Sequence, residues 1–327
     1  MRRTIGTALV GLGVFLVVAA GLIRFYAYPT LATVPSSYDE MTYLESKGAQ
    51  VFNTDPSVLA PQTTDLSIAA HTVADNSGSS SIPQHVSVWN NNTTVTRADG
   101  TIFQQSQERI PFDSVTGAGV ACGSCGSWIQ STKGQEDAVV FTGQTYKFPF
   151  NTQKHDYQNW DDTLLAATTA KYVGETSIKG MKVYKFVQTI DPRVISHQEV
   201  PGSVFGSKAP SVNAAMVYGM ERTLYIEPAT GTPVQRVEVR TQELEYAGST
   251  VPAFDGTVEY TDAQVQKNVD NLSNKAPWLA GARTWIPLTG LLLGLVLLGL
   301  GLLLTRASSA AQDADQDHGS DRPLVGV

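Results

Sequence analysis

Two long uncharged apolar runs, one near each end of the 327-residue chain, constrain its fold more than any other feature. The first covers residues 5–23 and the second covers residues 285–305. At about 1.5 Å per residue, a helix of either length matches the roughly 30 Å hydrocarbon core of a bilayer. We therefore predict two transmembrane helices, one before and one after a domain at residues 24–284.

A cleaved signal peptide is the alternative interpretation of the first run. Its apolar core would be shorter, about 7–15 residues, and a small-x-small cleavage site would follow. Instead the sequence continues Arg24-Phe-Tyr-Ala-Tyr-Pro29, whose aromatic residues are typical of a membrane interface. This pattern favours a retained anchor.

The charges beside the two runs predict an orientation. Arg2 and Arg3 precede the first run, and Arg306 follows the second. By the positive-inside rule, residues 1–4 and 306–327 are cytoplasmic, and residues 24–284 lie outside a cell membrane that the chain crosses twice. The tail 306–327 carries several aspartates among small polar residues, so we expect it to be disordered.

Gly290 and Gly294 form a Gly-x-x-x-Gly pattern in the second run. Small residues at this spacing let another helix approach closely, which makes this pair a candidate packing site. Glycine is also common in membrane helices generally, and that is the plainer explanation.

The residues between the two runs indicate β structure. The segments that are rich in β-branched and aromatic residues are 66–73, 85–96, 101–110, 137–142, 170–174, 181–190, 222–227, 233–246 and 255–261. Asp99-Gly100 predicts a hairpin turn. Residues 39–47 and 261–273 suggest helices, the second capped by Thr261 or Asp262.

Closely spaced strands with few helices predict a mainly β domain built on a curved antiparallel sheet, either a sandwich or a half-barrel. A membrane β-barrel is not expected, since the strands lack repeated ten-residue dyads and aromatic girdles. The net charge of −7, without a basic cluster, argues against binding of nucleic acid.

Cys122-Gly-Ser-Cys125 contains the only two cysteines of the chain. A dithiol redox site would need a helix N-terminus in a βαβ unit, whereas a glycine-rich loop surrounds this motif. We therefore favour a structural disulfide, which agrees with an oxidising compartment outside the membrane. The five histidines are dispersed without ligand spacing, so no metal site and no cofactor are expected.

No nucleophile elbow and no phosphate-binding loop occur, so we do not expect an enzyme. Two acidic pairs, Asp161-Asp162 and Glu136-Asp137, are candidates for a carboxylate site. Neighbouring residues of a strand point to opposite faces, however, and carboxylates are mostly exposed. We interpret both pairs as solvated surface.

Aromatic residues are the better candidates for a binding site. Core packing is their commonest role, but rings can also line the apolar mouth of a curved sheet. The candidate lipid-binding residues are Trp128, Phe148, Phe150, Trp160, Tyr184 and Phe186.

Three blocks carry a resemblance to a known family: residues 146–161, residues 172–175, and Glu221-Arg-Thr-Leu-Tyr-Ile-Glu-Pro-Ala-Thr-Gly231. They resemble an uncharacterised-domain family of actinobacterial membrane proteins labelled "porin PorA family". Its mycobacterial relatives are implicated in lipoglycan maturation and in trehalose mycolate transport. Residues 174–186 and 224–234 are also similar to strand pairs of periplasmic lipoprotein carriers, which are half-barrels around an apolar cavity.

The resemblance implies a membrane-anchored, non-catalytic protein that binds or presents a lipid or glycolipid during cell-envelope assembly. Its partners would then be the membrane and that ligand. The alternative is a scaffold for an envelope lipid transporter or a glycosyltransferase. A thiol-disulfide oxidoreductase that uses Cys122 and Cys125 is a remote third alternative.

Overall fold

The computed structural model describes residues 2–75, 82–132 and 134–317, and it consists of two units. One unit combines the N-terminal residues as far as Ala32 with the residues from Pro277 onward. The other unit is the β-rich segment Thr33–Ala276.

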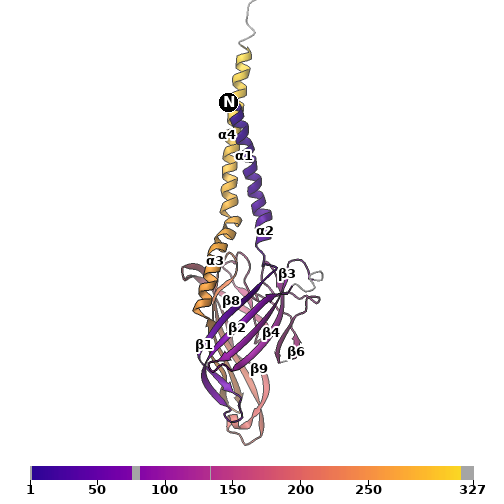
Figure 1. Ribbon diagram of the computed structural model, residues 1–327, viewed down its shortest axis with the longest axis vertical. Helices are drawn as coiled ribbons and strands as arrows, with labels where there is room; N and C mark the ends of the chain where they lie inside the picture. Colours follow the sequence, from indigo (N-terminus) through magenta and orange to yellow (C-terminus); the bar gives the residue numbers. More distant parts are fainter. Residues whose placement is uncertain (1, 76–81, 133, 318–327) are drawn as a thin grey trace, which may run out of the picture. The chain divides into compact units, whose positions relative to one another are not determined.

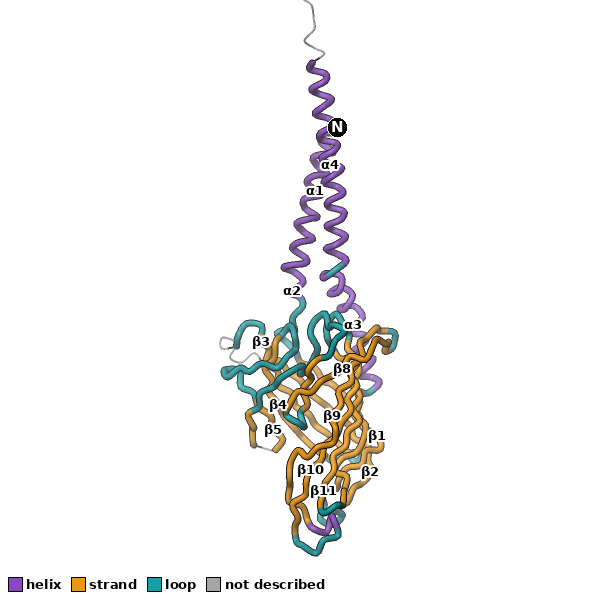
Figure 2. The backbone as a smooth tube through the Cα atoms, turned by 180° about the vertical axis from the view of Figure 1, so that it is seen from behind, coloured by secondary structure: helices purple, strands orange, loops and turns teal. Residues whose placement is uncertain are grey.

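The first unit is a pair of helices. Helix α1 (Arg2–Leu22) continues through the π-helical turn η1 (Ile23–Ala27) into α2 (Tyr28–Leu31). Helix α4 (Trp285–Asp317) lies beside α1 in both views (Figures 1 and 2). Residues Arg3–Leu31 and Trp285–Ala307 are both long and apolar enough to cross a membrane.

Glycines let α1 and α4 approach closely. A Cβ atom added to Gly294 would lie 2.9 Å from the carbonyl oxygen of Gly13, and one on Gly301 would lie 2.8 Å from that of Gly6. A Cβ atom added to Gly290 would lie 3.5 Å from the Cβ atom of Ala20. In this structure the Gly290 and Gly294 side of α4 therefore packs against α1 of the same chain.

Helix α4 runs through Asp317, so the structure departs from the expectation of a disordered tail from residue 306. Alanine and glutamine after Arg306 are good helix formers, which allows an existing helix to continue at little cost. The rest of the predicted tail, residues 318–327, lies outside the described residues.

The second unit is built on one antiparallel sheet of twelve strands. The strands are β1 (Asp39–Asn53), β2 (Ala60–Ala74), β3 (Val86–Arg97), β4 (Ile102–Asp113), β5 (Trp128–Thr132), β6 (Gln135–Ala138), β7 (Tyr157–Asp161), β8 (Ala166–Ile178), β9 (Met181–Pro201), β10 (Ser211–Ile226), β11 (Pro233–Tyr246) and β12 (Ser249–Tyr260). Their order is β6-β5-β4-β3-β2-β1-β12-β11-β10-β9-β8-β7, and the 3₁₀ turn η2 (Gly202–Phe205) joins β9 to β10.

The sheet is not closed, but one connecting segment reaches both of its ends. Gln144, between β6 and β7, forms an isolated bridge with Ala118 just beyond β4 and another with Asn159 in β7. Gly119 also donates its backbone N–H to the carbonyl oxygen of Gly143 at 2.8 Å. The residues around Gln144 therefore link opposite ends of a strongly curved sheet.

The mainly β fold and its curved antiparallel sheet are confirmed, as a single open sheet rather than a sandwich. The Asp99-Gly100 hairpin is also confirmed, because it joins β3 to β4. The helix predicted at residues 39–47 is wrong, since these residues form β1. Pairing with β2 on one side and β12 on the other outweighs the weak helix preference of the segment.

Helix α3 (Asp262–Arg283) confirms the helix predicted at residues 261–273. The Thr261 hydroxyl accepts the backbone N–H of Gln264 at 3.1 Å, as expected of an N-cap. Val265, Val269 and Leu272 are buried against Val183 and Val234 of the sheet. Lys267 adds an ion pair with Glu40 of β1 at 2.6 Å.

Candidate functional site

A buried arginine lies at the centre of the polar interior of the sheet. Arg222 of β10 is 5% exposed, and Nε donates to Glu238 at 2.5 Å. Its Nη1 donates to Gln188 at 2.8 Å and to the carbonyl oxygen of Trp160 at 3.0 Å. Its Nη2 reaches Asp161 at 3.2 Å. Every nitrogen of this guanidinium is thus satisfied by groups from β7, β9 and β11.

Glu238 of β11 is fully buried among three arginines. Besides Arg222, it pairs with Arg236 at 3.2 Å and with Arg240 at 2.7 Å. Burial by itself would raise the pKa of Glu238, but the three guanidinium groups outweigh it and hold the pKa well below its usual range. Glu238 is therefore ionised, as a buried charge with such partners should be.

Asp161 corrects the interpretation of the first acidic pair as solvated surface. Its side chain is 1% exposed, and besides Arg222 it accepts the hydroxyl of Tyr218 at 3.0 Å. Two backbone N–H groups after β7, those of Thr163 and Leu164, also donate to it. The second pair, Glu136 and Asp137, is exposed as expected.

Beside this network lie two carboxyl groups that form no ion pair with the described residues. Glu108 of β4 accepts the side-chain amide of Asn91 at 2.9 Å, and Asp162 follows β7. Burial, and next the charge of the nearby Asp162, raise the pKa of Glu108 to about 8. Burial likewise raises the pKa of Asp162. The curvature of the sheet has thus brought β4 close to the end of β7, nine places away in the strand order.

Both carboxyl groups keep contact with solvent although many protein atoms surround them. Glu108 is half-buried, and Asp162 is exposed. Water therefore reaches each of the two side chains. We call Glu108, Asp162, Tyr146 and Arg236 the interior cluster, because each influences or is influenced by the charge of another member.

Several polar atoms around the interior cluster have no hydrogen-bond partner within the described part of the chain. They are the Tyr146 hydroxyl and the indole N–H groups of Trp89 and Trp160. Burial raises the pKa of Tyr146 well above its usual value, so this phenol stays protonated. Protonated carboxyl, phenol and indole groups all donate hydrogen bonds, which suits an uncharged ligand rich in hydroxyl oxygens.

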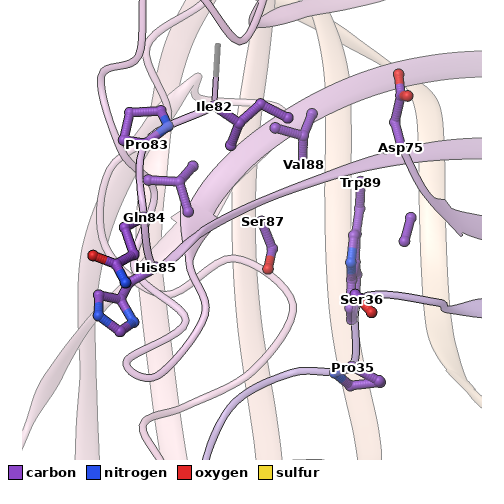
Figure 3. A pocket seen from close by; sticks show the side chains of 12 residues that line it. Pro35, Ser36, Asp75, Ile82, Pro83, Gln84, His85, Ser87, Val88 and Trp89 are labelled. Atoms are coloured by element: carbon purple, nitrogen blue, oxygen red, sulfur yellow. The ribbon is translucent and has the colours of Figure 1, made fainter. Parts of the chain in front are cut away.

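A pocket of about 270 Å³ lies next to this region, at the end of β2 and the start of β3 (Figure 3). Its lining is mixed but contains more apolar than polar side chains. The residues are Pro35, Ser36, Ala74, Asp75, Ile82, Pro83, Gln84, His85, Val86, Ser87, Val88 and Trp89. Trp89 connects the two regions, because its ring also contacts that of Tyr146 at 5.0 Å between centroids.

The disulfide loop supports one wall of this pocket. Cys122 and Cys125 are bonded, as predicted. The carbonyl oxygen of Cys125 accepts Nε of Arg109 at 2.7 Å, and the same guanidinium pairs closely with Asp75 of the pocket lining. The loop therefore contributes to pocket structure through Arg109.

The predicted lipid-binding rings do not gather around one cavity. Phe148 and Phe186 lie in one packed cluster with Leu224 and Ile226, and Tyr184 packs at its border. Trp160 lies in a second cluster, where Phe150 packs partly buried. Trp128 is half-buried in β5. An acyl chain could reach Phe148, Phe186 or Trp160 only by displacing core contacts.

Sequence reasoning missed the residues of the polar interior. Alternation along 233–246 could have drawn attention to Arg236, Glu238 and Arg240, three charges on one face of a predicted strand. Glu108 carried no such signal. Its setting depends on Asp162, 54 residues away, and only the curvature of the sheet brings the two together.

The fold and its polar interior define a class of protein: a β domain between two helices that could span a membrane. The model of the Porin PorA family matches residues 5–303, and the chain therefore belongs to this family. Together with the apolar helices, this membership indicates a membrane protein of the cell envelope.

Two curated relatives, each described as Porin PorA, come from corynebacteria. The protein of Corynebacterium resistens is 27% identical over 29% of this chain and 35% of its own length. That of Corynebacterium amycolatum is 25% identical over 59% of this chain and 58% of its own length. This chain thus spans about a third of the length of the first relative and somewhat over half of the length of the second.

Among solved structures, a putative exported protein of Bacteroides fragilis with a YmcC-like fold aligns with 70% of this chain and 96% of its own. The identity is 9% and the TM-score is 0.21, too low to support an argument about fold or function.

Proposed function

We propose that this protein is a membrane-anchored, non-catalytic binding protein that holds the polar head group of an envelope glycolipid inside its curved sheet. In this proposal both termini are cytoplasmic and the β domain faces outward. The arginines beside the apolar helices and the disulfide between Cys122 and Cys125 support that orientation. The membrane and the glycolipid would be its partners.

The observation that carries the proposal is the interior cluster. Glu108 and Asp162 keep contact with water, and burial raises the pKa of both carboxyl groups. A pKa of about 8 keeps the proton on Glu108 at neutral pH. The Tyr146 hydroxyl beside them has no partner in the described part of the chain. Such groups can donate to and accept from sugar hydroxyls without burying a net charge.

The neighbouring salt-bridge network supports binding rather than chemistry. Arg222, Glu238 and Asp161 are occupied with one another, so they hold the interior cluster in place instead of contacting a ligand. A preformed site of this kind loses little free energy to reorganisation when a ligand enters.

The test is mass spectrometry of lipids that copurify with the detergent-extracted, full-length chain. We expect a glycolipid that is enriched over bulk membrane lipid, and we expect its amount to fall in the Tyr146→Phe and Asp162→Asn variants. Glu136→Gln is the matched control, because Glu136 is an exposed carboxylate on β6. Bulk phospholipid at background levels, or equal glycolipid in all variants, would refute the proposal.

One observation favours a second function, that of a scaffold for an envelope transporter or a glycosyltransferase. The rings that could have lined an acyl cavity are packed into cores. In that case, cross-linking in cells should capture one envelope enzyme or transporter reproducibly, and the interior variants should leave the capture unchanged.

A further inference from the structure

The pocket beside Trp89 has a rigid frame. Ala74 donates its backbone N–H to the carbonyl oxygen of Tyr38 at 2.7 Å, and Asp75 donates to that of Val88 at 2.8 Å. The Trp89 ring stacks on Tyr38, with centroids 4.2 Å apart and planes 8° apart. The wall that Trp89 forms is therefore fixed by contacts within the β unit rather than by a ligand.

Most side chains in the lining of this pocket are apolar, and Ser36, Gln84, His85 and Ser87 are the uncharged polar or imidazole groups beside them. Pro35, Ala74, Ile82, Val86 and Val88 supply aliphatic surface, and Trp89 supplies an aromatic face. The one carboxylate of the lining, Asp75, is neutralised by Arg109 and also accepts Asn90. An ionic ligand would compete with this pair, whereas an uncharged apolar group would not.

The size of the pocket suits part of a ligand. Drug-sized ligands need about 300–1,000 Å³, and an apolar cavity of about 150 Å³ already binds benzene. At about 270 Å³, this pocket accommodates a short stretch of hydrocarbon. It lies beside the polar interior, because Trp89 lines the pocket and contacts Tyr146 of the interior cluster.

We propose that this pocket binds the end of an alkyl chain, with Trp89 as its wall. The proposal rests on the proposed function in one respect: an amphiphile whose polar part lies near Tyr146 would place hydrocarbon here. The ligand class is then a neutral amphiphile with a flexible chain, and the pocket would contribute to affinity through buried apolar surface.

The experiment uses the full-length chain in detergent, with Trp278 and Trp285 replaced by phenylalanine because both are exposed on the helices. The probe is ω-bromododecanol, a neutral alcohol whose terminal bromine quenches tryptophan fluorescence on contact. We expect saturable quenching that disappears when Trp89→Phe is added. This loss assigns the signal to the pocket rather than to Trp128 or Trp160.

A filled pocket provides the decisive comparison. Ala74→Leu adds three carbon atoms, the space of about three methylenes, which should weaken binding roughly fiftyfold. Thr63→Leu, exposed on the same strand, should bind like the parent. If Ala74→Leu fails to fold, Ser87→Leu fills the pocket from β3 instead. Equal binding by filled and control variants, or no quenching by Trp89, overturns the proposal.

The two proposals can fail separately. Quenching without a copurifying glycolipid would keep the alkyl pocket and reject the glycolipid function. A copurifying glycolipid without quenching would do the reverse.

Discussion

Arg109 donates a hydrogen bond from Nε to the carbonyl oxygen of Cys125 at 2.7 Å, and this contact joins the disulfide loop to strand β4. The same guanidinium pairs with Asp75 in the lining of the Trp89 pocket. Replacing Cys122 and Cys125 by serine should therefore loosen both the loop and the pocket wall. Closing so short a loop is worth roughly 2 kcal/mol in the chain-entropy relation. We expect lower thermal stability and faster amide exchange around Asp75. A reductant should produce the same two changes in the parent and no change in the variant. Unchanged exchange at Asp75 would contradict this link.

Arg222→Met should destabilise the β unit strongly. The substitution removes one of the positive charges that offset the buried carboxylate of Glu238, and it removes the guanidinium that pairs with Asp161. Breaking a buried pair typically costs about 3–5 kcal/mol. Chemical unfolding of the extracted chain measures the loss. Arg193→Met, at an exposed position of β9, is the matched control and should change stability by less than about 0.5 kcal/mol. Similar values for both variants would show that the network is not needed for folding.

Glu108 should make the protein less stable as the pH rises. The folded state holds the Glu108 proton up to a pKa of about 8, whereas the unfolded state releases it near the ordinary value of 4.5. The folded state thus binds more protons between these values, and the free energy of unfolding falls as the pH increases. Glu108→Gln removes this dependence. The melting temperature of the variant, relative to that of the parent, should therefore rise as the pH increases toward 8. A constant difference between the two chains across this range would disprove the shift.

Gly294→Leu should separate α1 from α4. A side chain at this position meets the backbone of Gly13 within 3 Å, and backbone cannot move aside cheaply. Gly299→Leu is the control, since open space surrounds that glycine. We expect a lower melting temperature and a lower yield of extracted protein for the first variant only. Equal yields and melting temperatures would mean that this close approach is not needed.

Phe186→Ala tests whether the predicted lipid-binding rings are core residues. Phe186 is fully buried against Phe148, and removing such a ring costs about 3–5 kcal/mol. Unfolding measurements should show this loss, while Val173→Ala at an exposed site of β8 should show little. A small loss for Phe186→Ala would indicate a space that a ligand could occupy instead.

Local patterns foretold most of the secondary structure. Asp99-Gly100 formed the expected turn because this dipeptide tolerates the backbone geometry of a tight hairpin, and Thr261 capped α3 because its hydroxyl satisfies a free N–H group. For residues 39–47, local patterns predicted a helix, but these residues form part of β1. Their own preference is weak, and two neighbouring strands decided their conformation.

The candidate site was much less predictable. Aromatic rings drew attention because large apolar residues serve both cores and binding sites, and composition cannot separate the two uses. Asp161 looked like exposed surface in the sequence, yet Arg222, 61 positions later, makes its burial possible.

The sequence by itself determined the two apolar helices, the β-rich domain between them and the cysteine pair, because each depends on neighbouring residues and on their periodicity. Only the tertiary structure decided which polar residues face one another. The sheet curves until β4 and the end of β7 meet, and the charge of Asp162 then contributes to the raised pKa of Glu108. It also decided that Gly294 packs against Gly13 of the same chain, since helix pairing depends on residues 281 positions apart.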